Sequence, residues 1–131
     1  MILFVDTSDF NGLRLALLDP QAKSVINEST YSVAYNENYK TAEFLQKFLR
    51  QNKTAPKDLT KIIVCSGPGS FTGIRVGVAL AQALGFALNI PVVAIKKNQI
   101  PQNLVRLIAF RSGKHLLLNY GHKPNITKPK R

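Results

Sequence analysis

The chain has 131 residues, of which 45% are hydrophobic and 19% are charged; this fits one folded domain and excludes a disordered body. A single Cys excludes a disulfide scaffold and a Cys-based zinc module. The formal net charge is +11, and residues 96–131 hold nine Lys/Arg and no acid, so the basic character belongs to the C-terminal quarter.

No secretory signal is expected, because the opening Met-Ile-Leu-Phe-Val-Asp lacks a basic region and a cleavage site; we expect a cytoplasmic protein. Residues 76–95 carry no charge and are long enough to span a bilayer. Gln82, Asn89 and Pro91 interrupt this stretch, which favours a buried helix followed by a buried strand over a membrane span.

The N-terminal third is typical of an antiparallel meander, because short apolar runs alternate with turn signals. We expect strands at 2–6 and 13–18, turns at Asn11-Gly12 and Asp19-Pro20, and the rest of the meander at 25–26 and 31–35. A helix should follow at about 39–52, capped by Asn38 or Thr41, since Ala42, Leu45, Phe48 and Leu49 recur at the helical period.

The second half alternates strands and helices. Cys65 ends an apolar run and is expected to be a buried structural thiol. We expect a strand at 62–65, a glycine-rich loop at 66–73, a helix at 74–89, a strand at 92–95, a helix at 101–110 and a last strand at 116–118. The order β-β-β-α-β-α-β-α predicts an α/β mixed sheet with helices on its faces, and it is similar to the RNase H-like core of the actin, Hsp70 and sugar-kinase group.

The glycine-rich loop and the helix after it are the most informative segments. The loop residues Gly67, Pro68, Gly69, Ser70, Phe71 and Thr72 fit neither a Walker motif nor Gly-x-Gly-x-x-Gly, and both phosphate binding and a structural turn remain open. In the helix, which looks buried all round, Gly73, Gly77, Ala81 and Gly85 form a stripe almost without side chains. This glycine stripe favours close packing, either on the chain's own sheet or on a partner protein.

These segments resemble the TsaB (YeaZ) family over about residues 1–95. The resemblance rests on the run from Gly67 to Gly77, on Asn89-Ile90-Pro91-Val92-Val93 and on the opening Leu3–Ser8. It implies an actin/Hsp70-type fold and a non-catalytic role in making N6-threonylcarbamoyladenosine beside the anticodon of tRNAs that read codons starting with A. The family pairs with its catalytic paralogue TsaD through two helices, here at about 39–52 and 73–89. The expected partner is a TsaD-type protein, a second copy or both, with a TsaE-type ATPase as a further partner. The predicted interface residues are Leu45, Phe48, Leu49, Gly73, Gly77, Ala81 and Gly85.

The candidate site residues agree with a non-catalytic role. His115 and His122 are seven residues apart, so no His pair has metal-ligand spacing. Asp6, Thr7 and Asp9 are candidates for a nucleotide-bound magnesium ion, although Asp is also a common turn former after a strand. We expect no cofactor on this chain alone, and ATP with magnesium only in the complex with the catalytic paralogue.

Two features depart from the family pattern. Lys40-Thr41 stands where the family often has a His-Ser or His-Thr pair, and family members are longer, with a second subdomain. We therefore expect a shortened form, in which residues 1–95 are the core and the basic segment 96–131 replaces most of that subdomain. Its ending, Tyr120-Gly121-His122-Lys123-Pro124, resembles the family's Tyr-x-Arg-x-Pro.

The sequence leaves three alternative functions. In the first, the chain is a basic accessory module that binds tRNA through Lys114, Lys123, Lys128, Lys130 and Arg131, with an affinity that falls steeply with salt. In the second, it is a degenerate homologue that acts only as a homodimer. A sugar-kinase-type enzyme is the weakest alternative, because the residues for that chemistry are missing.

Overall fold

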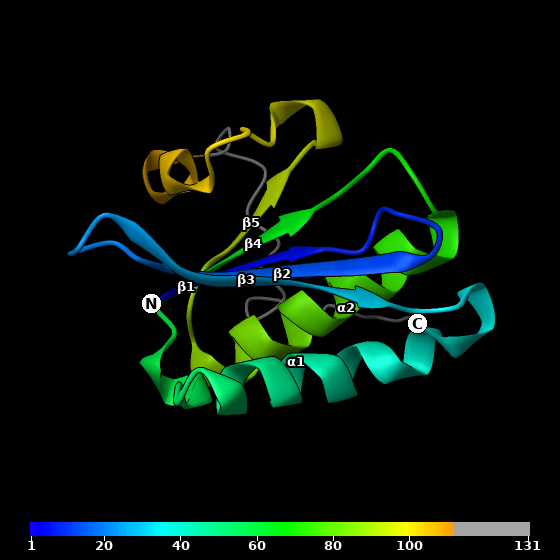
Figure 1. Ribbon diagram of the computed structural model, residues 1–131, viewed down its shortest axis with the longest axis horizontal. Helices are drawn as coiled ribbons and strands as arrows, with labels where there is room; N and C mark the ends of the chain where they lie inside the picture. The colour runs from blue at the N-terminus through cyan, green and yellow to red at the C-terminus, as the bar shows by residue number, and fades with distance from the viewer. Residues whose placement is uncertain (112–131) are drawn as a thin grey trace, which may run out of the picture.

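The computed structural model describes residues 1–111, which fold around one mixed five-stranded sheet (Figure 1). The strand order is β3-β2-β1-β4-β5. β2 pairs antiparallel with β1 and β3, whereas β4 pairs parallel with β1 and β5, which confirms the expected mixed sheet. The strands are β1 Ile2–Asp6, β2 Gly12–Asp19, β3 Ser24–Ser32, β4 Lys61–Cys65 and β5 Val92–Ile95.

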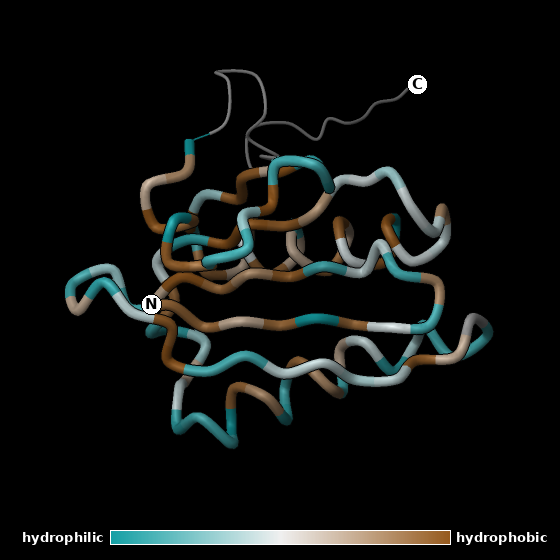
Figure 2. Tube along the Cα trace, turned by 45° about the horizontal axis from the view of Figure 1, so that its top comes forward, coloured by the Kyte–Doolittle hydropathy of each residue, from teal (hydrophilic) through white to brown (hydrophobic). Residues whose placement is uncertain are grey.

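Helices cover both faces of this sheet. α1 and α2 lie on one face, and two short 3₁₀ helices, η3 and η4, lie on the other (Figure 1). Figure 2 shows that α1 is polar on the side that faces away from the sheet and apolar on the side that faces it. The helices are η1 Tyr35–Lys40, α1 Thr41–Gln51, η2 Pro56–Asp58, α2 Phe71–Leu88, η3 Lys97–Gln99 and η4 Leu104–Ala109.

Each face of the sheet has its own hydrophobic core, because side chains alternate along a strand. In β1, Leu3 and Val5 point to the face where Phe48 of α1 packs. Ile2 and Phe4 point to the opposite face, which Leu104 and Leu107 of η4 close. Cys65 belongs to this second core and is fully buried, as expected, and burial raises the pKa of its thiol.

Three expected elements differ in the structure. The segments 25–26 and 31–32 belong to one continuous strand, β3, which pairs with all eight residues of β2, and residues 33–35 lie beyond its end. The predicted cap by Asn38 or Thr41 is wrong: Lys40 precedes α1, and the carbonyl of Asn38 accepts the Thr41 amide. The helix expected at 101–110 is the shorter η4, because the side chain of Asn103 accepts the Val105 amide and starts the turn there. The strand expected at 116–118 lies outside the described residues.

Candidate functional site

The carboxyl ends of the three parallel strands meet at one edge of the sheet, and the loops that follow them are bonded together. The Ser70 amide donates to the Ser8 carbonyl oxygen at 2.7 Å, which joins the loop after β4 to the loop after β1. The Lys97 amide donates to the Gly67 carbonyl oxygen at 2.8 Å, which joins the segment after β5 to the same glycine-rich loop. We call this set of three loops the loop edge.

Within the loop edge, the glycine-rich loop adopts a conformation that needs its glycines. Gly67 has φ +106° and Gly69 has φ +154°, and a Cβ on Gly69 would overlap the Ser8 carbonyl. Ser70 then caps α2, because its Oγ accepts the Gly73 amide at 3.1 Å, so the helix begins earlier than expected. This geometry supports the structural interpretation of the loop, with Phe71 and Thr72 exposed on the first turn.

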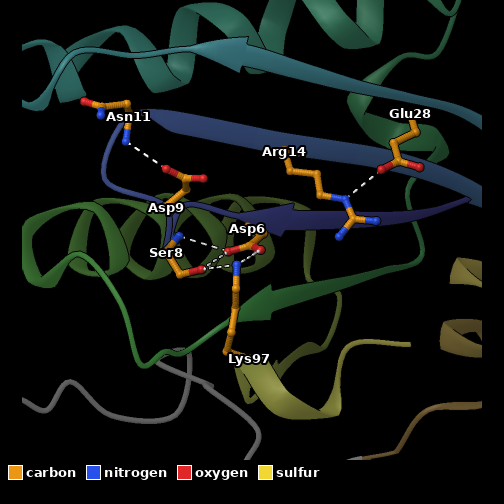
Figure 3. A network of polar contacts seen from close by, with 7 residues as sticks. All are labelled: Asp6, Ser8, Asp9, Asn11, Arg14, Glu28 and Lys97. Atoms are coloured by element: carbon orange, nitrogen blue, oxygen red, sulfur yellow. Dashed lines mark hydrogen bonds and ion pairs between the residues drawn. The ribbon is translucent and has the colours of Figure 1, made fainter. Parts of the chain in front are cut away.

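Asp6 is the centre of a polar network at the loop edge (Figure 3). Its Oδ1 accepts the Ser8 amide at 2.9 Å and the Ser8 hydroxyl at 2.6 Å. The Lys97 ammonium donates to Asp6 Oδ2 at 3.0 Å and to Ser8 Oγ at 2.8 Å. Burial alone would raise the pKa of the Asp6 carboxyl, but the bonds from Ser8 and Lys97 outweigh it and hold that pKa below its usual value.

The residues considered for a magnesium site are not brought together as ligands. Both oxygens of Asp6 already accept hydrogen bonds, and Asp9 is exposed, with its Oδ1 accepting the Asn11 amide at 3.0 Å (Figure 3). The Thr7 hydroxyl is buried against Gly77. In residues 1–111, no group of three or more His, Cys, Asp or Glu side chains has the arrangement of a metal site. The loop edge therefore does not fit a magnesium ion while Lys97 holds Asp6.

The glycine stripe of α2 faces the chain's own sheet. A Cβ on Gly73 would overlap the Thr7 carbonyl, one on Gly77 would overlap the Thr7 hydroxyl, and one on Gly85 would overlap the Val92 side chain. Ala81 is buried in the same layer. Close packing on the chain's own strands and loops thus accounts for the stripe.

This placement corrects the residues expected at a partner interface. Leu45, Phe48 and Leu49 are buried in the core as well, and of the seven predicted residues only Leu45 and Leu49 also reach a surface that a partner could contact, where they line a groove between α1 and α2. A partner that docks on these helices must use this groove or the side of α2 that lies away from the glycine stripe.

The opposite side of α2 is exposed and apolar, so the expectation that this helix is buried all round is wrong. With 3.6 residues a turn, the side away from the glycine stripe contains one contiguous set. Ala79, Ala83, Phe86 and Ala87 are exposed there, Phe86 to 64%, and Val76 and Leu80 beside them are half-buried. We call these six residues the outer face of α2. Arg75 is the single charged residue in the helix.

A groove adjoins this outer face. It has a volume of about 360 Å³ and runs between α1 and α2, where Leu45, Leu49 and Leu84 line it together with Arg50. Leu84 lies one turn from Leu80 of the outer face. By length and composition α2 is also the one helix of the described residues that is apolar enough to cross a membrane.

Two sets of sequence predictions lie outside the described residues. These are the histidines His115 and His122 and the proposed RNA contacts Lys114, Lys123, Lys128, Lys130 and Arg131. In contrast, sequence reasoning missed Lys97, which is 91 residues away from Asp6 along the chain. It also missed the outer face of α2, because a uniformly apolar helix gives no signal for which side is buried.

Comparisons with known proteins give matches described as TsaD and as TsaB. Residues 33–118 match the family model described as "TsaD: tRNA N6-adenosine threonylcarbamoyltransferase". The tRNA threonylcarbamoyladenosine biosynthesis protein TsaB of Bacillus subtilis is 39% identical over 72% of this chain and 40% of its own length. TsaB of Buchnera aphidicola subsp. Schizaphis graminum is 34% identical over 56% of this chain and 35% of its own length.

A solved structure gives the same result. YeaZ from Pseudomonas aeruginosa superposes with a TM-score of 0.64 and 26% identity, over 72% of this chain and 43% of its own, which confirms the RNase H-like core. The chain thus spans less than half the length of the relatives described here. The family model, the two sequences and the shared sheet together show that the chain belongs to the TsaB (YeaZ) family.

Proposed function

We propose that this chain is a non-catalytic docking subunit in the formation of N6-threonylcarbamoyladenosine on tRNA. In this role it pairs with a TsaD-type catalytic paralogue through the outer face of α2 and the adjoining groove. The observation that carries the proposal is the outer face itself: an exposed helical surface with no acidic residue and one flanking Arg. Apolar patches of this kind mark protein interfaces on soluble domains. The Bacillus subtilis relative is named for the same pathway.

The chemistry of the loop edge supports a role without catalysis. Ser8 is buried and bonded to Asp6 and Lys97, so its hydroxyl is not presented to a substrate. The Cys65 thiol is buried with a raised pKa, which keeps it protonated and unreactive. Neither group has the exposure that a nucleophile needs.

The nucleotide proposal follows from the same network. We expect this chain alone to bind ATP weakly or not at all, because Lys97 already neutralises Asp6. Saturable micromolar binding of ATP with magnesium in a calorimetric titration would refute this. ATP binding in the complex, a TsaE-type ATPase partner, direct tRNA contact and a cytoplasmic location stay predictions.

The docking proposal is tested by light scattering after size exclusion, on the chain alone and mixed with the TsaD-type protein of the same organism. We expect a one-to-one complex for the wild type and none for Ala83→Arg, which puts a long charged side chain on the outer face. Ala109→Arg is the matched control, because Ala109 is exposed in η4 on the opposite side of the sheet. Equal binding by both variants would refute the proposed interface, and a dimer of the chain alone would favour the homodimer alternative.

A further inference from the structure

The groove between α1 and α2 is apolar along its floor and positively charged at one end. Leu45, Leu49 and Leu84 form the apolar part. Arg50, in the last turn of α1, lines the same groove and is exposed. Because Arg50 stands beside aliphatic side chains, an occupant must offer both an apolar surface and a group that tolerates a cation.

More cations surround this end of the groove. Lys53 and Lys57 are exposed and flank Thr54 and Pro56, which belong to the groove lining. The ion pairs of the described residues are Arg14–Glu28, Lys40–Glu37 and Lys97–Asp6, and none of them involves Arg50, Lys53 or Lys57.

The acidic residue next to Lys57 in the sequence forms no ion pair with these three cations. Asp58 follows Lys57 directly, but its Oδ2 accepts the Ala55 amide at 2.9 Å. We call Arg50, Lys53 and Lys57 the basic rim of the groove. The rim keeps its positive charge available to an occupant.

We propose that the groove binds an acidic amphipathic helix of a different protein, whose Asp or Glu side chains face the basic rim while its apolar side chains enter the groove. This inference rests on the proposed docking function and specifies the chemistry of the partner. A helix laid in an apolar groove is an established mode of recognition, and opposite charges at the rim set its orientation and speed its association.

A second copy of this chain is a poorer occupant than an acidic protein. Each copy has a formal net charge of +11, and residues 41–60 hold four Lys/Arg against two acids, so two copies bring like charges to the same contact. RNA would satisfy the basic rim, but its phosphates gain nothing from the apolar floor or from the outer face of α2.

The test measures the affinity of the full chain for the TsaD-type protein at low and at high salt. We expect the Arg50→Glu, Lys53→Glu double variant to bind about tenfold more weakly at low salt. Its affinity should also lose most of the salt dependence that the wild type shows. Lys57→Glu is a second variant at the rim, with a smaller loss expected. Arg106→Glu is the matched control, since Arg106 is exposed in η4 on the other side of the sheet and should bind like the wild type.

The outcomes separate this inference from the proposed function. If Ala83→Arg abolishes binding while the rim variants bind like the wild type, the acidic partner is refuted and the docking function stands. If the wild type forms no complex at either salt, both are refuted. If the rim variants strengthen self-association of the chain, the groove binds a second copy. If they abolish binding to tRNA, the groove binds RNA. Either result would overturn the proposal that an acidic helix occupies it.

Discussion

At the scale of single residues, Lys97 sets the charge balance of the loop edge. Its ammonium group donates to the buried Asp6 carboxylate and to the Ser8 hydroxyl, and it balances the negative charge of that carboxylate. The Lys97 side chain is 47% exposed whereas that of Asp6 is 4% exposed, so the pair lies at the boundary between core and solvent. Water weakens such a pair compared with a fully buried one.

We expect Lys97→Met to lower the free energy of unfolding at pH 7 by about 1–2 kcal/mol, because it leaves a buried carboxylate without its cation. The pKa of Asp6 is lowered in the fold, so the stability that Asp6 supplies is present above its ordinary pKa of about 3.9 and is lost as the pH falls through the lowered value. The difference between variant and wild type should therefore shrink below about pH 4. Urea unfolding across this range measures it, with the exposed neighbour change Lys96→Met as the control; a pH-independent difference would contradict the account.

Gly77 gives a second prediction at this scale. We expect Gly77→Ala to lower the free energy of unfolding by about 1–2 kcal/mol, since overlap with Thr7 outweighs the gain in helix propensity. Adding Thr7→Ala removes the overlapping hydroxyl and methyl groups and should recover part of the loss. Thermal unfolding of the two single variants and the double variant measures this coupling, and strict additivity would count against the packing described.

At the scale of elements, the predictions that held rest on strong local signals. The runs at 2–6, 62–65 and 92–95 form strands as predicted. Each is a short, largely apolar run, which is typical of a buried parallel strand. The sequence could not show which side of α2 faces the sheet, since a helix that is apolar throughout has no polar side to mark the solvent. The hydrophobic period also does not encode the contacts that bound the 3₁₀ helices: the Thr41 amide donates to the Asn38 carbonyl oxygen at the end of η1, and the Val105 amide donates to Asn103 Oδ1 at the start of η4.

The start of α2 provides a test at this scale. We expect Ser70→Ala to lower the free energy of unfolding by about 1 kcal/mol, because the Gly73 amide loses the side-chain oxygen that caps it. Chemical denaturation of the purified chain measures the change. Ser66→Ala is the control, since the Ser66 hydroxyl makes only a long contact of 3.4 Å with the Ile95 carbonyl oxygen; an equal loss from both would exclude a specific capping role.

At the scale of the whole molecule, the two sides of the sheet are covered in different ways. η4 closes one side through Leu104 and Leu107, and α1 and α2 cover the other side (Figure 1). The outer face of α2 is largely exposed to solvent. The sequence signature predicted the family, which the comparisons confirm, whereas pairing through α1 and α2 stays a prediction. The glycine stripe could not locate a partner surface, because the same small residues that suggest a partner are needed to bring α2 close to the chain's own Thr7.

The central claim is that a partner docks on the outer face of α2, and its most direct test is the N6-threonylcarbamoyladenosine content of tRNA. It is made in a bacterium depleted of its own TsaB that expresses this chain. We predict that the wild type and Ala109→Arg restore the modified nucleoside and that Ala83→Arg, produced at the same level, does not. Restoration by Ala83→Arg, or no restoration by the wild type, would contradict the account.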